Sequence, residues 1–344
     1  MTQVTSNSHR IEVIAAPANL SSVAASLSSG QWGTLTVTNQ MNIDPTGTGD
    51  GMFSFSPQIT WDNLHNVARF WGGCHGTGGG PEHLYLGTYT DSTNSWPSVP
   101  VNAAEVVNTI THAYFSATID QQTGDVYTSE PFWDLSHVWK YSWATQSWSN
   151  PLPSSTIWGA HCAALTVVYH PGLYGTHGGL VLGSNSGIWT IDLRATTPAW
   201  TLILDRTQQV NAMPDFPAGI YDYKTQCVYV GGSTGFWQIA ASAGAGTPVQ
   251  VTAPTISPQG GQRIVTSSGN PANNMLVMDQ SGNGVEFNGS TWSSFTTNAP
   301  AGLLSTTNNW YAAGAVPAYG VIIFPRGELS PTPKTSLTMY VWKR

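Results

Sequence analysis

Three histidines recur at a nearly constant spacing and are the residues of this sequence best suited to act together in chemistry. His65, His112 and His161 are separated by 47 and 49 residues, and each stands just ahead of a segment that reads as a β-strand. If the chain repeats one structural unit at this interval, the three imidazoles face the same end of the assembled repeats. Such a ring could bind a divalent metal or an acidic sugar.

Two further residues extend this candidate binding set, which consists of His65, Arg69, His112, Tyr114 and His161. Arg69 and Tyr114 lie on the strands that follow two of the histidines and supply a positive charge and a hydroxyl group. A polysaccharide lyase needs a base and a group that neutralises a uronate carboxylate, and this set contains both chemistries. The alternative interpretation is structural, with the imidazoles bonded to backbone groups where repeats meet. No residue is assigned as catalytic.

A recurring tryptophan defines the interval. Trp32, Trp96, Trp148, Trp200 and Trp292 each follow a polar or small residue, at spacings of 64, 52, 52 and 92 residues. The last spacing nearly halves if a degenerate copy of the repeat, which lacks the tryptophan, lies between Trp200 and Trp292. The resulting period of about 45 to 50 residues is typical of the four-stranded blades of β-propellers.

The composition favours one all-β domain. Charged residues make up 8% of the chain, against about 25% in ordinary soluble domains, and 36 glycines and 22 prolines mark frequent turns. Six repeats of this period use almost all of the 344 residues as one unit. We expect an N-terminal arm over residues 1–29 and a single β-propeller domain over residues 30–344.

The two ends of the chain are incomplete in complementary ways. In the first repeat the segment 66–71 reads as the inner strand, and the last repeat, from about residue 309, stops before any outer strand. Residues 31–38 form an outer-strand phrase with no blade before it. We therefore predict an all-β, six-bladed β-propeller whose ring is closed by this N-terminal strand, which completes the last blade and removes the free sheet edges. Seven blades is the alternative count.

Several of these repeats resemble the kelch phrase, in which a glycine pair precedes a tyrosine strand that ends in Thr-x-x-Trp. The residues that carry the resemblance are Gly72, Gly73, Tyr89, Thr93 and Trp96 in one repeat and Tyr141, Thr145 and Trp148 in the next. The match is partial in the other repeats. The resemblance implies a fold similar to that of kelch and galactose-oxidase-like propellers, and fold alone does not imply function.

The copper radical oxidases of that superfamily require a histidine late in the propeller, which this chain lacks. Tyr169 and His170 mimic part of their site, but every histidine stands at or before His177. No other side chain replaces that ligand well. We therefore expect neither a metal nor another cofactor.

Charge and cysteine content exclude other classes. The net charge is −7 without any basic run, so we expect no nucleic-acid partner. The three cysteines, Cys74, Cys162 and Cys227, are widely spaced and fit neither a disulfide framework nor a zinc site, so we expect free buried thiols. No stretch approaches the about 20 apolar residues of a membrane span, and the N-terminus lacks a secretory signal pattern.

These features favour a structural component of a bacteriophage virion, in the tail or the head-to-tail assembly. The chain has few lysines, is rich in Ser, Thr, Asn and Gly, and would be made in the host cytoplasm without a signal peptide. Its expected partners are other virion subunits, in a homo-oligomer or larger assembly, and a host surface glycan is a further candidate. The alternatives are a glycan-binding module on a virion or cell surface and a propeller-fold polysaccharide lyase.

Overall fold

The protein is built from short antiparallel strands. The computed structural model describes residues 19–39, 58–73, 84–96, 98–100, 115–129, 137–154, 165–205, 207, 217–256, 263–279, 281–303, 312–326 and 336–344. Within these ranges the helical elements are α1 (Leu20–Ser26) and a 3₁₀ turn at Asp91–Thr93. The expected all-β class is confirmed.

Four sheets have four strands each, paired in chain order. The first contains β7 (Ala117–Ile119), β8 (Val126–Ser129), β9 (Val138–Ser142) and β10 (Ser147–Ser149). The second contains β11 (Thr166–His170), β12 (Gly179–Ser184), β13 (Gly187–Asp192) and β14 (Thr201–Asp205). The third contains β15 (Ala218–Asp222), β16 (Cys227–Gly231), β17 (Phe236–Ile239) and β18 (Pro248–Val251). The fourth contains β19 (Arg263–Thr266), β20 (Met275–Asp279), β21 (Asn283–Phe287) and β22 (Trp292–Thr296).

A fifth sheet has nine strands and joins the two ends of the chain. Its strands are β1 (Trp32–Asn39), β2 (Ile59–Asp62), β3 (Val67–Gly73), β4 (Leu84–Thr90), β5 (Ser95–Trp96), β6 (Ser98–Pro100), β23 (Gly314–Val316), β24 (Val321–Arg326) and β25 (Ser336–Lys343). The strand β1 pairs antiparallel with β25 on one side and parallel with β5 on the other. The described part of the chain therefore forms five hydrogen-bonded sheets.

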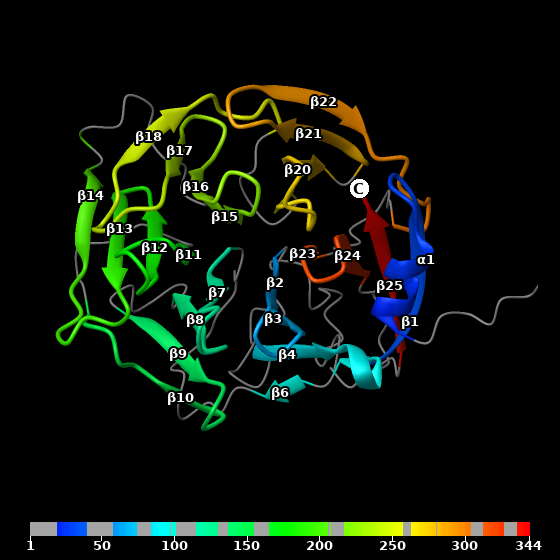
Figure 1. Ribbon diagram of the computed structural model, residues 1–344, viewed down its shortest axis with the longest axis horizontal. Helices are drawn as coiled ribbons and strands as arrows, with labels where there is room; N and C mark the ends of the chain where they lie inside the picture. The colour runs from blue at the N-terminus through cyan, green and yellow to red at the C-terminus, as the bar shows by residue number, and fades with distance from the viewer. Residues whose placement is uncertain are drawn as a thin grey trace, which may run out of the picture.

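The first strands of the successive sheets surround the centre of the molecule. Figure 1 shows β2, β7, β11, β15 and β23 nearest the middle, with later strands such as β10, β14, β18 and β22 at the periphery. Neighbouring first strands contact one another, as β2 does with both β7 and β23. A Gln58–Ala313 bridge adds a parallel contact between the two ends of the nine-stranded sheet.

The apolar core fills the spaces between adjacent sheets. Trp61, Phe70 and Tyr89 on one face of the β2-β3-β4 strands pack with Val316 and Ile323 of β23 and β24. On the other face, Trp71 packs with side chains of the β7–β10 sheet. The inner and middle strands thus bury both faces, which explains why β11, β12, β16 and β20 are buried along nearly their whole length, whereas β10, β14, β18 and β22 are partly exposed.

The helix α1 lies within the segment predicted to be an arm, yet it belongs to this core. Its Leu20 and Val23 are buried against β1 and β25. Asp91 accepts hydrogen bonds from the backbone N–H groups of Leu20 and Ser21, at 2.7 and 3.3 Å, and so holds the first turn of the helix. Residues 1–18 lie outside the described ranges.

The prediction of the inner strand in the first repeat was wrong. The strand nearest the centre is β2, and residues 67–73 form β3, the second strand of the sheet. The local pattern misled because β2 has only four residues and ends in a buried aspartate, Asp62, whereas β3 is longer and mostly apolar. Burial between sheets, rather than strand length, determines which strand lies innermost.

Cys227 is a free, buried thiol, while Cys74 and Cys162 lie outside the described residues. None of the helices in the described ranges is long and apolar enough to span a membrane.

Candidate functional site

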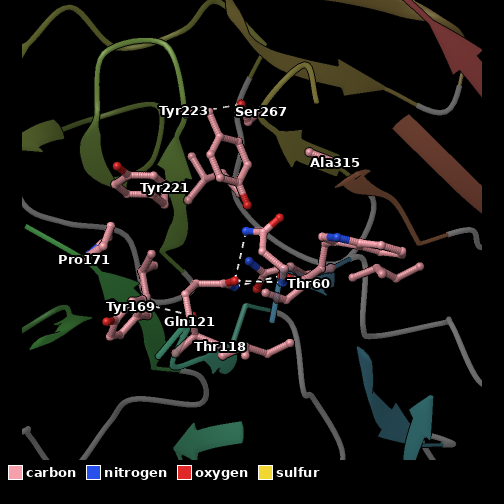
Figure 2. Close-up of a pocket in the computed structure, with 16 residues that line it drawn as sticks. Thr60, Thr118, Gln121, Tyr169, Pro171, Tyr221, Tyr223, Ser267 and Ala315 are labelled. Carbon is pink, nitrogen blue, oxygen red and sulfur yellow. Dashed lines mark hydrogen bonds between the residues drawn. The ribbon is translucent and has the colours of Figure 1, made fainter. Parts of the chain in front are cut away.

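A cavity of about 290 Å³ lies at the centre, where the first strands meet (Figure 2). Its wall is formed by Thr60 of β2, Thr118 of β7, Val168 of β11, Ile220 of β15 and Ala315 of β23. These residues come from strands that are far apart in the sequence, so the cavity forms only when all the sheets pack around one axis. Concave sites of this kind are where small ligands bind most often.

The rim of the cavity is built from residues of the turns that follow the first strands. Asn63, Gln121, Pro171 and Tyr223 each stand in the turn between the first and second strand of a sheet, and Ser267 directly follows β19. Successive rim residues are therefore structurally equivalent. A single turn position, repeated from sheet to sheet, produces a ring of side chains around the opening.

Hydrogen bonds fix the orientation of these rim residues. The Oε1 atom of Gln121 accepts from the backbone N–H and from Nδ2 of Asn63, at 3.0 and 2.9 Å, while its Nε2 donates to the Trp61 carbonyl at 2.8 Å. On the other side, the Tyr223 hydroxyl lies near the Asn63 side chain, and the Tyr223 N–H donates to Ser267 Oγ at 3.3 Å. The rim is therefore held in one arrangement before any ligand arrives.

Two tyrosines supply the aromatic surface of the cavity. The rings of Tyr221 and Tyr223 meet edge to face, with centroids 5.4 Å apart and an interplanar angle of 85°. Burial raises the pKa of each phenol to about 12, so both hydroxyls remain protonated at neutral pH. All of the described residues that line the cavity are then uncharged.

An aspartate directly before Asn63, Gln121 and Tyr223 anchors the turn at each of these three rim positions. Asp62 Oδ1 accepts from the N–H groups of Leu64 and His65, at 2.9 and 3.1 Å. Asp120 Oδ1 accepts from the Gln122 N–H at 3.0 Å, and Asp222 accepts from the Thr225 N–H at 3.0 Å. These side-chain-to-backbone bonds are typical of Asx turns and explain why an aspartate recurs here.

His65 lies in the turn between β2 and β3 and not at the start of the innermost strand. Its Nδ1 atom is 2.7 Å from Asp62 Oδ2, and its ring stacks on Trp143 with centroids 4.0 Å apart. His65 is not among the residues that line the central cavity. Its contacts place it between two neighbouring sheets.

Arg69 also lies between these two sheets. It is 6% exposed on β3, its Nη1 donates to Thr88 Oγ1, and its guanidinium carbon lies 4.4 Å from the centre of the Trp143 ring. Burial lowers the pKa of Arg69 to about 10, despite the opposing effect of the Asp62 carboxylate, so the side chain is still protonated at neutral pH. The structure therefore brings Arg69 and His65 together around one tryptophan.

The other members of the predicted set, His112, Tyr114 and His161, lie outside the described residues. The joint role of the five residues at a channel face therefore stays a prediction. Across the ranges that the structure describes, no group of three or more His, Cys, Asp or Glu side chains is arranged to hold a metal ion.

Sequence reasoning missed the rim residues, although a signal for them exists. The dipeptides Asp62-Asn63, Asp120-Gln121 and Asp222-Tyr223 stand at equivalent positions of three repeats, directly after a short β-prone stretch. An aspartate that opens a turn is a recognisable pattern. Its recurrence at the repeat interval would have pointed to Asn63, Gln121 and Tyr223 as neighbours in space.

Comparison with known proteins identifies the architecture. No family model matches the chain, and no curated protein sequence does. An auxiliary nutrient binding protein from Bacteroides thetaiotaomicron superimposes with a TM-score of 0.54 at 10% identity, covering 90% of this chain and 76% of that one. The chain has a β-propeller fold. Each of its four-stranded sheets is a blade of this fold.

Two further propellers of known structure superimpose less closely. YCF48 bound to a D1 peptide gives a TM-score of 0.47 at 10% identity, over 92% of this chain and 98% of that one. An alpha-L-arabinofuranosidase from Fusarium graminearum, in complex with an iminosugar inhibitor, gives 0.47 at 9% identity, over 90% and 97% of the two chains.

Proposed function

We propose that this β-propeller is a glycan-binding protein that takes a carbohydrate into its central cavity. The observation that carries the proposal is the lining, which combines the oriented amides of Asn63 and Gln121 with the rings of Tyr221 and Tyr223 and contains no charge among its described residues. Amides and hydroxyls match the alternating donors and acceptors of sugar hydroxyl groups. Tyrosine rings provide an apolar surface with a polar tip, which suits the face of a sugar ring.

The size of the cavity favours a short ligand. Its volume of about 290 Å³ is near the lower end of the about 300–1,000 Å³ of typical small-molecule sites. A monosaccharide or disaccharide unit of a longer glycan fits this range. Because the rim is already held by hydrogen bonds, little ordering is needed on binding.

Binding to an oligosaccharide panel tests this proposal. Tyr223→Phe removes a hydroxyl of the cavity lining that is available to a sugar hydroxyl and should weaken binding about tenfold, the cost of one lost hydrogen bond in a buried site. The matched control is Tyr174→Phe, which removes the hydroxyl that bonds to Thr190 outside the cavity at 2.9 Å and should leave affinity unchanged. Isothermal titration calorimetry measures both. If no oligosaccharide binds the wild-type protein, carbohydrate binding is wrong.

We also propose that the ring has six blades and is kelch-like, with β1 completing the last blade. The register of β1 and β25, which runs from Trp32 opposite Trp342 to Thr38 opposite Ser336, supports this closure. Repeated ring contacts support the kelch phrase. The ring centroids of Tyr89 and Trp96 lie 5.7 Å apart, and those of Tyr141 and Trp148, at the same sequence spacing, lie 5.2 Å apart. The β2-β3-β4 and β23-β24-β25-β1 strands would then be two blades joined by β5.

The role as a structural virion protein, with other virion subunits as partners, remains a separate proposal. Its support is the composition, with few charges and abundant small polar residues. Mass spectrometry of sedimentable particles from a lysate of the source organism tests it. A fixed ratio of this chain to other particle proteins is expected, and its absence from particles would contradict the role. The lyase alternative depends on His112 and His161 and stays a prediction.

A further inference from the structure

The wall of the central cavity has a polar side and an apolar side. Thr60 of β2 and Thr118 of β7 form the polar side, and these two strands contact each other. Val168 of β11 and Ile220 of β15 form the apolar side, and these strands are also in contact. Trp61 and Ile119, which alternate with the threonines, belong to the cores between sheets. Like side chains are therefore grouped around the cavity.

The rim repeats this division. The amides of Asn63 and Gln121 follow β2 and β7, on the side of the threonines, whereas the rings of Pro171 and Tyr223 follow β11 and β15. Figure 2 shows Gln121 on one side of the opening and Tyr223 on the other. The hydroxyl of Ser267, which is beyond Tyr223, already accepts from the Tyr223 N–H. The polar groups that remain for a ligand are thus concentrated on the β2 and β7 side.

The two threonines offer a pair of neighbouring hydroxyl groups. Thr118 Oγ1 accepts from the Tyr169 N–H at 2.8 Å, which leaves its hydrogen to be donated to a ligand. Among the described residues, the Thr60 hydroxyl has no hydrogen-bond partner. Each hydroxyl can both donate and accept. Two adjacent hydroxyls of a sugar ring match such a pair.

The apolar side lies across the cavity from these hydroxyls. Contacts between first strands give the order β2, β7, β11, β15 and β19, and β23 lies on the other side of β2. Two strands therefore separate β15 from β2 in either direction, and Ile220 faces Thr60. A ligand hydroxyl placed against Val168 or Ile220 would be buried without a partner, which is costly, whereas a methyl group would gain apolar contact.

We propose that the sugar bound in the central cavity is a 6-deoxyhexose. Its C2 and C3 hydroxyls face Thr60 and Thr118, and its C6 methyl group faces Val168 and Ile220. In a pyranose ring C5, which carries C6, lies opposite C2, so one sugar presents hydroxyls and a methyl group to the two sides at once. This inference rests on the proposed carbohydrate-binding function and names the ligand class of the same site.

The test compares sugars that differ by one hydroxyl group. Methyl glycosides of L-rhamnose, L-fucose and D-quinovose are titrated into the full chain, each beside its C6-hydroxylated counterpart, the glycoside of L-mannose, L-galactose or D-glucose. For the wild-type protein we expect the 6-deoxy member of a pair to bind about tenfold more tightly, within the range over which an apolar pocket rejects an added hydroxyl. Removal of the C2 or C3 hydroxyl from that sugar should weaken binding about tenfold.

Two substitutions separate the two sides of the cavity. Val168→Thr keeps the side-chain shape and puts a hydroxyl on the apolar side, so the preference for the 6-deoxy sugar should disappear. Thr60→Val removes a hydroxyl from the polar side and should weaken binding of both members of a pair equally, with the preference kept. Val249→Thr is the matched control, because Val249 is 57% exposed on the outer strand β18, and it should change neither affinity.

The outcomes distinguish this inference from the proposed function. Equal or tighter binding of the C6-hydroxylated sugar by the wild-type protein overturns the inference and leaves carbohydrate binding intact. A preference that persists in full in Val168→Thr overturns the placement of the methyl group. Ile220→Thr, at a half-buried position, repeats that test if Val168→Thr does not fold. Undiminished binding of the sugars that lack the C2 or C3 hydroxyl overturns the orientation, and failure of every sugar to bind overturns both proposals.

Discussion

At the scale of single residues, the position that closes each first strand shows how one structural role can be filled by different chemistry. Asp62, Asp120 and Asp222 accept hydrogen bonds from the N–H groups of the turn, and in the β11 blade His170 takes their place. Its Nδ1 accepts from the Gly172 N–H at 3.1 Å. His170 must therefore be neutral in the folded protein, with its proton on Nε2.

This requirement makes stability depend on pH. Burial lowers the pKa of His170 to about 4, below the 6.5 of an exposed histidine. Between these values the unfolded chain binds a proton that the folded chain does not, so stability falls as the pH is lowered from 6.5 to 4. The expected contribution is roughly 3 kcal/mol of unfolding free energy. Urea denaturation of wild-type protein and His170→Asn at pH 7 and pH 4 measures it.

Asparagine is the suitable replacement because its side-chain oxygen can still accept from the turn but does not titrate. The difference between the two proteins should be larger at pH 7 than at pH 4, in favour of the wild type. His177→Asn is the control, since His177 is an exposed residue paired with Asp192 at 3.0 Å. An identical loss of stability in wild-type protein and His170→Asn over this range would contradict the prediction.

At the scale of elements, the first strands are packed closely enough that side-chain size is restricted. Gly219 of β15 faces β11, and a methyl group on its Cα would overlap with Thr166 Oγ1 and with the Val168 side chain. Thr166 cannot easily move away, because its hydroxyl donates to the Phe115 carbonyl at 3.1 Å. The glycine therefore sets how near two neighbouring blades approach at the cavity.

Gly219→Ala should accordingly destabilise the protein by about 1–3 kcal/mol, the usual cost of overpacking. Thermal or chemical denaturation measures this loss. Gly244→Ala is the matched control, because a methyl group there meets no atom within 4 Å and should change stability little. The close-packing argument fails if the two variants are equally stable. Ligand binding should weaken in Gly219→Ala alone, since Ile220 beside it lines the cavity.

Whether a strand can be recognised in the sequence depends on its length and on its apolar pattern. The β12 and β13 strands stand out in the sequence as apolar runs and are buried along nearly their whole length. By contrast, β2, β15 and β19 were not recognised, because each has four or five residues and ends in a polar residue. Short strands at the centre of a propeller obtain their stability from neighbouring blades rather than from a long apolar pattern.

At the scale of the whole molecule, the two ends of the chain depend on each other. Strand β1 pairs with β25, and the Trp32 and Trp342 rings stack with centroids 5.1 Å apart and nearly parallel planes. Without β1, the hydrogen-bonding edge of β25 would be exposed, which is an aggregation hazard. The pairing therefore protects this edge of β25, and β1 in turn pairs with β5 on its other side.

A pair of truncations tests this dependence. Removal of residues 1–39 deletes α1 and β1, whereas removal of residues 1–31 deletes α1 and keeps β1. We expect the longer truncation to melt at least about 10 °C below the shorter one, since several kcal/mol of strand pairing are lost. A synthetic peptide of residues 30–39 should restore stability by adding the missing strand. Equal melting temperatures for the two truncations would show that β1 does not close the ring.

The sequence by itself determined the all-β class and the repeat interval, because both are written in local patterns of tryptophan, glycine and apolar stretches. It also pointed to the pairing of the N-terminal strand with the end of the chain, because two incomplete repeats complement each other. Only the tertiary structure decided which strands surround the axis and which turn residues meet there. Asn63, Gln121 and Tyr223 converge through the packing of separate blades, and contacts so distant in sequence leave no local pattern that identifies the partners.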